Sequence, residues 1–126
     1  MKRAEAGSSV AVLGASPKEE RYSYKAVKML TEHGFKAIPV HPAGHTVLGI
    51  PGKKSLEEIS ESVDTLTMYV GASISDKELD HILALKPRRV VFNPGAENQA
   101  LAQKLREAGI EVVEACTLVM LQTDQF

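Results

Sequence analysis

Short runs of β-prone residues alternate along this chain with longer segments of helical periodicity, and this alternation limits the possible folds more than any other feature. The strand-like runs are Val10–Leu13, Lys36–Val40, Thr65–Val70, Arg89–Phe92 and Ile110–Val113. Helical segments are expected at Tyr24–His33, from Ser75 to about Leu85, at Glu97–Ala108 and at Cys116–Leu121. Consecutive parallel strands need a crossover connection, which is usually a helix. The pattern therefore predicts an α/β fold with a five-stranded, mostly parallel sheet and helices on both faces.

Local signals define several of the expected helix ends. Ser23 is predicted to be the N-cap of the first helix, and Gly34 is expected to stop it. The segments Ser55–Glu58 and Ser75–Glu78 both match the Ser-x-x-Glu capping box, which predicts a helix start at each. The Gly- and Pro-rich segment 41–54 is expected to be a loop with room for a short strand at Thr46–Leu48.

Composition is that of one soluble globular domain. The chain has 126 residues, 44% hydrophobic and 25% charged, with a formal net charge of −1. A chain so close to neutral has no overall field that would attract nucleic acid or an anionic membrane. No apolar run approaches the ~20 residues that span a bilayer, residues 1–9 contain no apolar signal-peptide region, and the single cysteine suits a reducing compartment. We expect a cytoplasmic protein with a flexible segment at 1–9 and one Rossmann-like domain at 10–126.

Four strand exits carry small or turn-forming residues: Gly14-Ala-Ser16, His41-Pro42, Gly71-Ala-Ser73 and Asn93–Ala96. Parallel strands place their carboxyl ends at one edge of the sheet, where ligands bind at the topological switch point. Tight turns need small residues whether or not a ligand binds, so one such exit does not by itself indicate a ligand site. The four together favour a ligand site.

The loop after the first strand does not fit a dinucleotide such as NAD. A Gly-x-Gly-x-x-Gly loop lets the backbone approach a pyrophosphate, whereas no glycine follows Gly14 until Gly34. NAD sites also place a carboxylate after the second strand for the ribose hydroxyls, but that position reads Val40-His41-Pro42. The loop cations Lys18, Arg21 and Lys25 could meet phosphates from outside the turn, and His45, Lys53 and Lys54 suit a ribose that bears a phosphate.

Several motifs, in order, resemble those of the stand-alone CoA-binding domains. These small bacterial proteins are similar to the N-terminal domain of the succinyl-CoA synthetase alpha subunit. The matching segments are "VLGAS", "RYSYKAV", "IPVHP" followed by "LGIPG", "FNPGAEN" and "CTLVML", which together cover residues 10–121. The resemblance implies a Rossmann-like fold that binds coenzyme A.

The resemblance also implies which residues contact CoA. The phosphates would be held by Gly14, Ala15, Ser16, Arg21, Ser23 and Lys25. The adenosine would lie beside His41, Pro42, Val70 and Gly71, and the pantetheine would face the turn that contains Asn93, Pro94 and Gly95. His41 stands where asparagine is more frequent in the family.

Succinyl-CoA synthetase needs a second domain with a phosphorylated histidine, and these 126 residues are taken up by the cofactor-binding fold. We therefore expect a module that binds CoA or an acyl-CoA without evident catalysis of its own. The alternative is an NADP-linked or acyl-CoA-handling enzyme component, completed by a partner protein or by a homo-oligomer.

Other chemistry-bearing residues give weaker indications. His33 and His81 fall on expected helices and are interpreted as surface groups, and His41 with His45 lacks the further ligands that a zinc site needs. No metal site and no catalytic acid–base pair is expected. Cys116 is either a packing residue or a thiol that meets the thiol end of CoA. The tyrosines at 22, 24 and 69 could stack on adenine or pack at the rim of the core.

Overall fold

A computed structural model describes residues 2–126 and contains one parallel sheet. The strand order is β2-β1-β3-β4-β5, and every neighbouring pair is parallel. The strands are β1 (Ser9–Leu13), β2 (Lys36–Val40), β3 (Thr65–Met68), β4 (Arg89–Phe92) and β5 (Glu111–Glu114). The expected α/β class, the five strands and their direction are confirmed.

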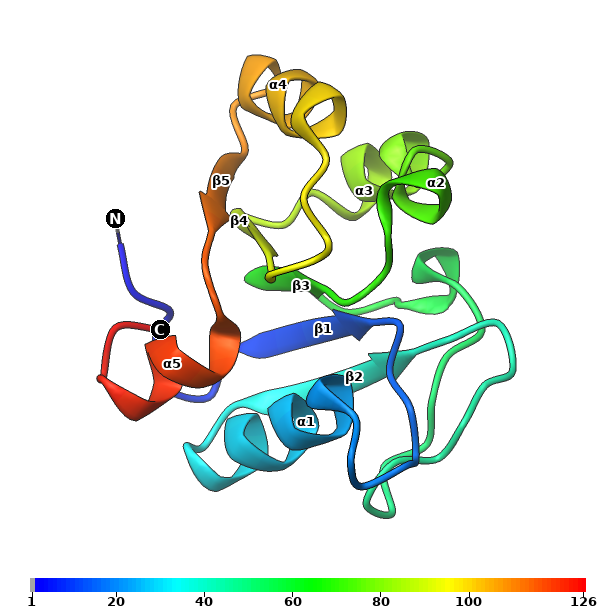
Figure 1. Cartoon of the computed structure of the whole chain (residues 1–126), viewed down its shortest axis with the longest axis vertical. Helices are drawn as coiled ribbons and strands as arrows, with labels where there is room; N and C mark the ends of the chain where they lie inside the picture. The colour runs from blue at the N-terminus through cyan, green and yellow to red at the C-terminus, as the bar shows by residue number, and fades with distance from the viewer. Residues whose placement is uncertain (1) are drawn as a thin grey trace.

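Helices cover both faces of this sheet (Figure 1). They are α1 (Tyr22–Glu32), the 3-10 helix η1 (Leu56–Glu58), α2 (Ala72–Ser75), α3 (Leu79–Leu85), α4 (Gln99–Glu107) and α5 (Thr117–Gln122). Helices α1 and α5 contact each other on one face, whereas α3 contacts η1 and α4 on the other. No helix within residues 2–126 has the length and apolar character needed to span a bilayer.

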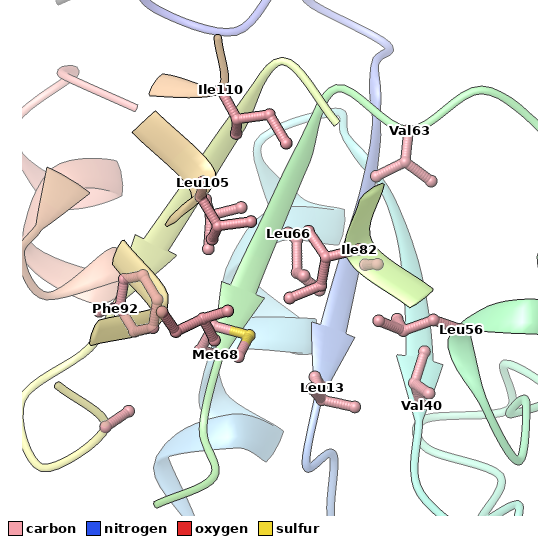
Figure 2. Packing of buried hydrophobic residues seen from close by; sticks show 14 of the residues in the cluster. Leu13, Val40, Leu56, Val63, Leu66, Met68, Ile82, Phe92, Leu105 and Ile110 are labelled. Carbon is pink, nitrogen blue, oxygen red and sulfur yellow. The ribbon is translucent and has the colours of Figure 1, made fainter. Parts of the chain in front are cut away.

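Two apolar clusters, one on each face, hold the layers together. Alternate residues of β1 enter opposite clusters: Val10 and Val12 lie with Val27 and Leu30 of α1, whereas Ala11 and Leu13 lie in the other cluster. On that second face, Leu105 and Ile82 pack over Leu66, Met68 and Phe92 (Figure 2). Strands buried on both faces read as continuous apolar runs, which is why the sequence located them well.

The first helix begins earlier than the capping pattern predicts. Arg21 is the N-cap residue and Ser23 lies inside the first turn, so the predicted cap at Ser23 is wrong. The side chain of Ser23 is buried and accepts a hydrogen bond from the Ser16 N–H at 3.1 Å. Its hydroxyl fixes the preceding loop to the helix and does not close the helix end. The stop at Gly34 is confirmed by its positive φ of 85°.

Neither predicted capping box forms. Ser55 precedes η1 without a side-chain cap, and Glu58 accepts instead from the Lys54 N–H at 2.7 Å. Ser75 is the last residue of the short helix α2, so the single helix expected from there to Leu85 is divided into α2 and α3. The expected strand at Thr46–Leu48 is reduced to an isolated bridge between Val47 and Ile50.

Near the amino terminus, residues contact the carboxyl-terminal end of the chain. The Ala4 N–H donates to the Phe126 carbonyl at 2.9 Å, and Arg3 pairs with Asp124 at 3.1 Å. Ser9, expected in the flexible segment, is the first residue of β1. Met1, which belongs to that expected segment, lies outside the described residues.

Candidate ligand site at the carboxyl edge of the sheet

A cavity of about 520 Å³ opens where the chain changes direction across the sheet. The connection after β1 leads to β2 on one side, and β3 lies on the other side of β1. This is the switch point at which open parallel sheets bind ligands. The cavity is lined by residues that follow β1, β2, β3 and β4: Gly14, Ser16, Lys18, Arg21, Tyr22, Ser23, His41, His45, Tyr69, Val70, Gly71, Pro94, Gly95 and Ala96.

Gly14 joins three of these strand exits. Its N–H donates to the Val40 carbonyl of β2 at 2.8 Å, and its φ is 90°. A Cβ atom at this position would lie 2.8 Å from both the Tyr69 carbonyl oxygen and Val70 Cγ1. Only glycine combines this backbone conformation with such a close approach. The single glycine of the loop therefore serves the packing of β1 against the β3 exit.

The amide groups that directly follow β1 are used within the protein. Gly14 and Ala15 both donate to Val40, the Ser16 N–H donates to Ser23, and the Lys18 N–H donates to Ser16 Oγ at 3.1 Å. Ala15 is fully buried and does not line the cavity, although the resemblance placed it at the phosphates. Positive charge at this wall comes from the side chains of Lys18 and Arg21 and from the start of α1.

Lys25 lies apart from these cations. It is exposed, and its Nζ lies 5.4 Å from the centre of the Tyr22 ring, whereas the residues that line the cavity do not include it. Tyr22 forms part of the cavity wall and is 67% exposed. Of the three cations that the sequence offered to the phosphates, Lys18 and Arg21 therefore line the cavity, whereas Lys25 stands behind a wall residue.

Two histidines line the cavity beyond β2. The rings of His41 and His45 lie 4.6 Å apart, and His41 Nδ1 accepts from the Ala43 N–H at 3.0 Å. Burial, and then the neighbouring charge of His45, lower the pKa of His41. His41 is therefore uncharged near neutral pH and can donate a hydrogen bond through Nε2. The adjacent Pro42 is exposed and does not line the cavity.

Gly52 fixes the position of His45. A Cβ atom at residue 52 would overlap the carbonyl oxygen of His45. The loop is tied to β2 by Lys53, whose N–H donates to Pro39 at 2.8 Å and whose carbonyl accepts from the His41 N–H at 3.0 Å. The motif "LGIPG" therefore folds the loop back so that both histidines face one cavity.

Tyr69, Val70 and Gly71 form the wall after β3. The Tyr69 hydroxyl is buried, has no hydrogen-bond partner among residues 2–126, and burial raises its pKa to about 12. Gly71 is the N-cap residue of α2, so the chain turns away from the cavity immediately after it.

Asn93, expected to face the pantetheine, is buried and forms hydrogen bonds within the protein. Its Nδ2 donates to Thr67 Oγ1 at 2.7 Å and to the Met68 carbonyl at 2.8 Å. Its Oδ1 accepts from the Thr117 N–H at 2.8 Å, so one side chain joins β3, β4 and α5. Pro94 and Gly95, which follow it, do line the large cavity.

A second, smaller chamber adjoins the first. It has a volume of about 220 Å³ and is lined by Tyr22, Tyr69, Asn93, Pro94, Cys116 and Leu118. Tyr22, Tyr69 and Pro94 belong to both walls. Cys116, the N-cap residue of α5, is a free thiol that is partly exposed.

The structure thus brings together at one cavity most of the residues that the sequence proposed. Gly14, Ser16, Arg21, Ser23, His41, Val70, Gly71, Pro94 and Gly95 line it, whereas Ala15, Lys25, Pro42 and Asn93 do not. The lining residues absent from that set are Lys18, Tyr22, His45, Tyr69 and Ala96. The loop cations and the His-x-x-x-His spacing were the available signals for Lys18 and His45. Within residues 2–126, no group of three His, Cys, Asp or Glu side chains is placed to hold a metal ion.

The model of the CoA-binding domain family matches residues 8–122. This chain is a member of that family. The CoA-binding domain shares 43% identity and a TM-score of 0.91 with the crystal structure of an uncharacterized protein, over 97% of this chain and 100% of that one. The protein YneT of Bacillus subtilis is 26% identical over 104 residues, which are 82% of this chain and 77% of YneT.

The same fold also occurs inside a larger enzyme. The dinucleotide-forming acetyl-coenzyme A synthetase 1 of Ca. Korarchaeum cryptofilum matches with a TM-score of 0.74 at 18% identity. The match covers 87% of the CoA-binding domain and 26% of the synthetase. At this identity, the likeness is one of fold.

Proposed function

We propose that this CoA-binding domain binds coenzyme A in the 520 Å³ cavity at the switch point. The observation that carries the proposal is a cavity lined by Lys18 and Arg21, beside the start of α1, in a chain of this family. Two cations and a helix N-terminus are suited to a diphosphate, because both contribute positive potential at short range.

The lining residues suggest an orientation for the ligand. The diphosphate would lie against Lys18 and Arg21 beside the start of α1, since the loop amides of Gly14, Ala15 and Ser16 already have partners within the protein. The adenosine would lie between the β2 and β3 exits, near His41 and Val70. The pantetheine arm would then run past Pro94. The neutral His41, with its Nε2–H, suits a hydrogen bond to the ribose or to its 3′-phosphate.

The proposal concerns binding, and any acyl-transfer chemistry would be supplied by a partner protein or a second copy of the chain. A thermal-shift and calorimetry panel with CoA, dephospho-CoA, NAD and NADP tests it. A ligand that binds only the folded state raises the apparent stability by mass action. We expect the largest shift with CoA and a smaller one with dephospho-CoA, which lacks the 3′-phosphate. Equal shifts with CoA and NAD would contradict the assignment.

A further inference from the structure

The smaller chamber differs in chemistry from the cavity it adjoins. The large cavity has cations and histidines in its wall, whereas the chamber has Tyr22, Tyr69, Pro94, Cys116 and Leu118. The one amide in its wall, Asn93, already uses both Nδ2 hydrogens and accepts one bond at Oδ1. The Tyr69 hydroxyl is buried and contributes almost no polar surface. The chamber therefore offers an apolar surface and few hydrogen bonds.

A bound CoA molecule would bring its sulfur end to this chamber. The pantetheine arm is expected to pass Pro94, which lines both spaces together with Tyr22 and Tyr69. A free thiol places one small apolar group against this surface, whereas an alkyl chain on a thioester gains with every further carbon removed from water. Apolar chambers stay dry and accept apolar ligands.

We infer that the chamber is an acyl pocket, and that the ligand of this protein is a CoA thioester with a short acyl chain. This inference rests on the proposed function, because the chamber adjoins the proposed CoA site. The chamber volume of about 220 Å³ equals the liquid share of roughly seven waters. That volume suits an acyl chain of a few carbons and excludes a long fatty-acyl chain.

The test compares acetyl-CoA, butanoyl-CoA and dodecanoyl-CoA by calorimetry, with CoA as the reference. Each methylene that leaves water should tighten binding by up to about fourfold. We expect butanoyl-CoA to bind about tenfold more tightly than acetyl-CoA, and dodecanoyl-CoA to gain nothing further. If CoA binds but the acetyl and butanoyl thioesters bind equally, the acyl pocket is ruled out and the CoA site stands. If CoA does not bind, the proposed function itself fails.

Two substitutions on α5 give a matched pair. Leu118→Trp fills the chamber and should remove the preference for butanoyl-CoA over acetyl-CoA. Val119→Trp adds the same side chain at a neighbouring position that is 52% exposed and is not part of the chamber wall, and it should keep the preference. Loss of the preference in both variants, or in neither, would contradict the inference.

Cys116 supplies a second measurement on the unaltered protein. It is the only cysteine of the chain, so alkylation by iodoacetamide followed by mass spectrometry reports on this chamber alone. We expect saturating butanoyl-CoA to slow alkylation severalfold more than saturating acetyl-CoA does; both are thioesters, so neither carries a free thiol that would consume the reagent. Equal protection by the two thioesters would place the longer acyl chain outside the chamber.

Discussion

At the scale of single residues, Gly14 controls both the fold and the cavity. It lies where three strand exits meet, and it is the point at which the loop turns toward α1. A side chain at this position would be strained by the positive φ and would also collide with the residues that follow β3. The residue therefore links the packing of the sheet to the shape of the site.

Gly14→Ala is expected to destabilise the domain by about 3 kcal/mol, because strain at a left-handed position adds to a collision with backbone. Gly34→Ala is the matched control, since its φ is 85° but nothing lies within 4 Å of the added Cβ. The control should cost about 1 kcal/mol. Urea unfolding of both variants measures the difference. Equal destabilisation would mean that the Tyr69–Val70 segment moves aside at no cost.

Arg21→Gln tests the phosphate wall. The substitution keeps a hydrogen-bonding side chain but removes the charge beside the cavity, and we expect CoA affinity to fall about tenfold, or ~1.4 kcal/mol for an exposed charge-assisted contact. Lys28→Gln removes an equal charge from an exposed position later in α1 and should leave the affinity within about twofold. Calorimetry at fixed ionic strength is required because these contacts are screened by salt. Similar losses in the two variants would indicate a general field effect.

At the scale of elements, η1 and α3 are joined by one histidine. His81 Nε2 lies 2.5 Å from Glu57 of η1, and Nδ1 lies 3.1 Å from Glu78. The hydrogen bond and charge of Glu78, followed by the charge of Glu57, raise the pKa of His81 above 6.5. Protonated His81 therefore attaches η1 to the helix beside it.

This contact predicts a pH-dependent stability. A raised pKa in the folded state stabilises the fold fully below pH 6.5, and the effect is lost as pH rises through the folded-state pKa. The difference in unfolding free energy between wild type and His81→Gln should be larger at pH 6 than at pH 8.5. Comparing the two proteins at each pH cancels the opposite contribution of His41, whose pKa is lowered. An equal difference at both pH values would show that His81 acts only by packing.

Sequence patterns predicted the strands better than the helix starts, for a physical reason. Residues 10–13 of β1 and 90–92 of β4 are buried on both faces, so solvent is excluded from each of them and the run is continuously apolar. Whether a side chain caps a helix depends on which backbone amide lies nearest to that side chain after folding. Ser23 turned toward the Ser16 amide, and Glu58 toward the amide of Lys54, contacts that their local patterns do not encode.

At the scale of the whole molecule, parallel topology made the location of the site predictable. Parallel strands bring the ends of β1, β2, β3 and β4 to one edge whatever the turn residues are. The choice of cation at that edge was not predictable in the same way. The path of the loop between Ser16 and Arg21 decides that Lys18 lines the cavity and Lys25 does not, and that path depends on contacts with β2 and α1.

The same geometry predicts how a ligand acts on the folded domain. CoA would bridge loops from four strand exits. By mass action, free CoA at 100 times its Kd should add about 2.7 kcal/mol to the free energy of unfolding. Amide hydrogen exchange should slow most at residues 16–24, 41–53, 69–75 and 93–98, where local opening is now coupled to ligand release. Peptides at the opposite edge, where Asp64 pairs with Arg88 at 2.8 Å, serve as the internal control and should be protected only through global stability. If exchange slows equally at both edges, the ligand acts without ordering the carboxyl-edge loops. If exchange slows only at the opposite edge, the ligand binds elsewhere.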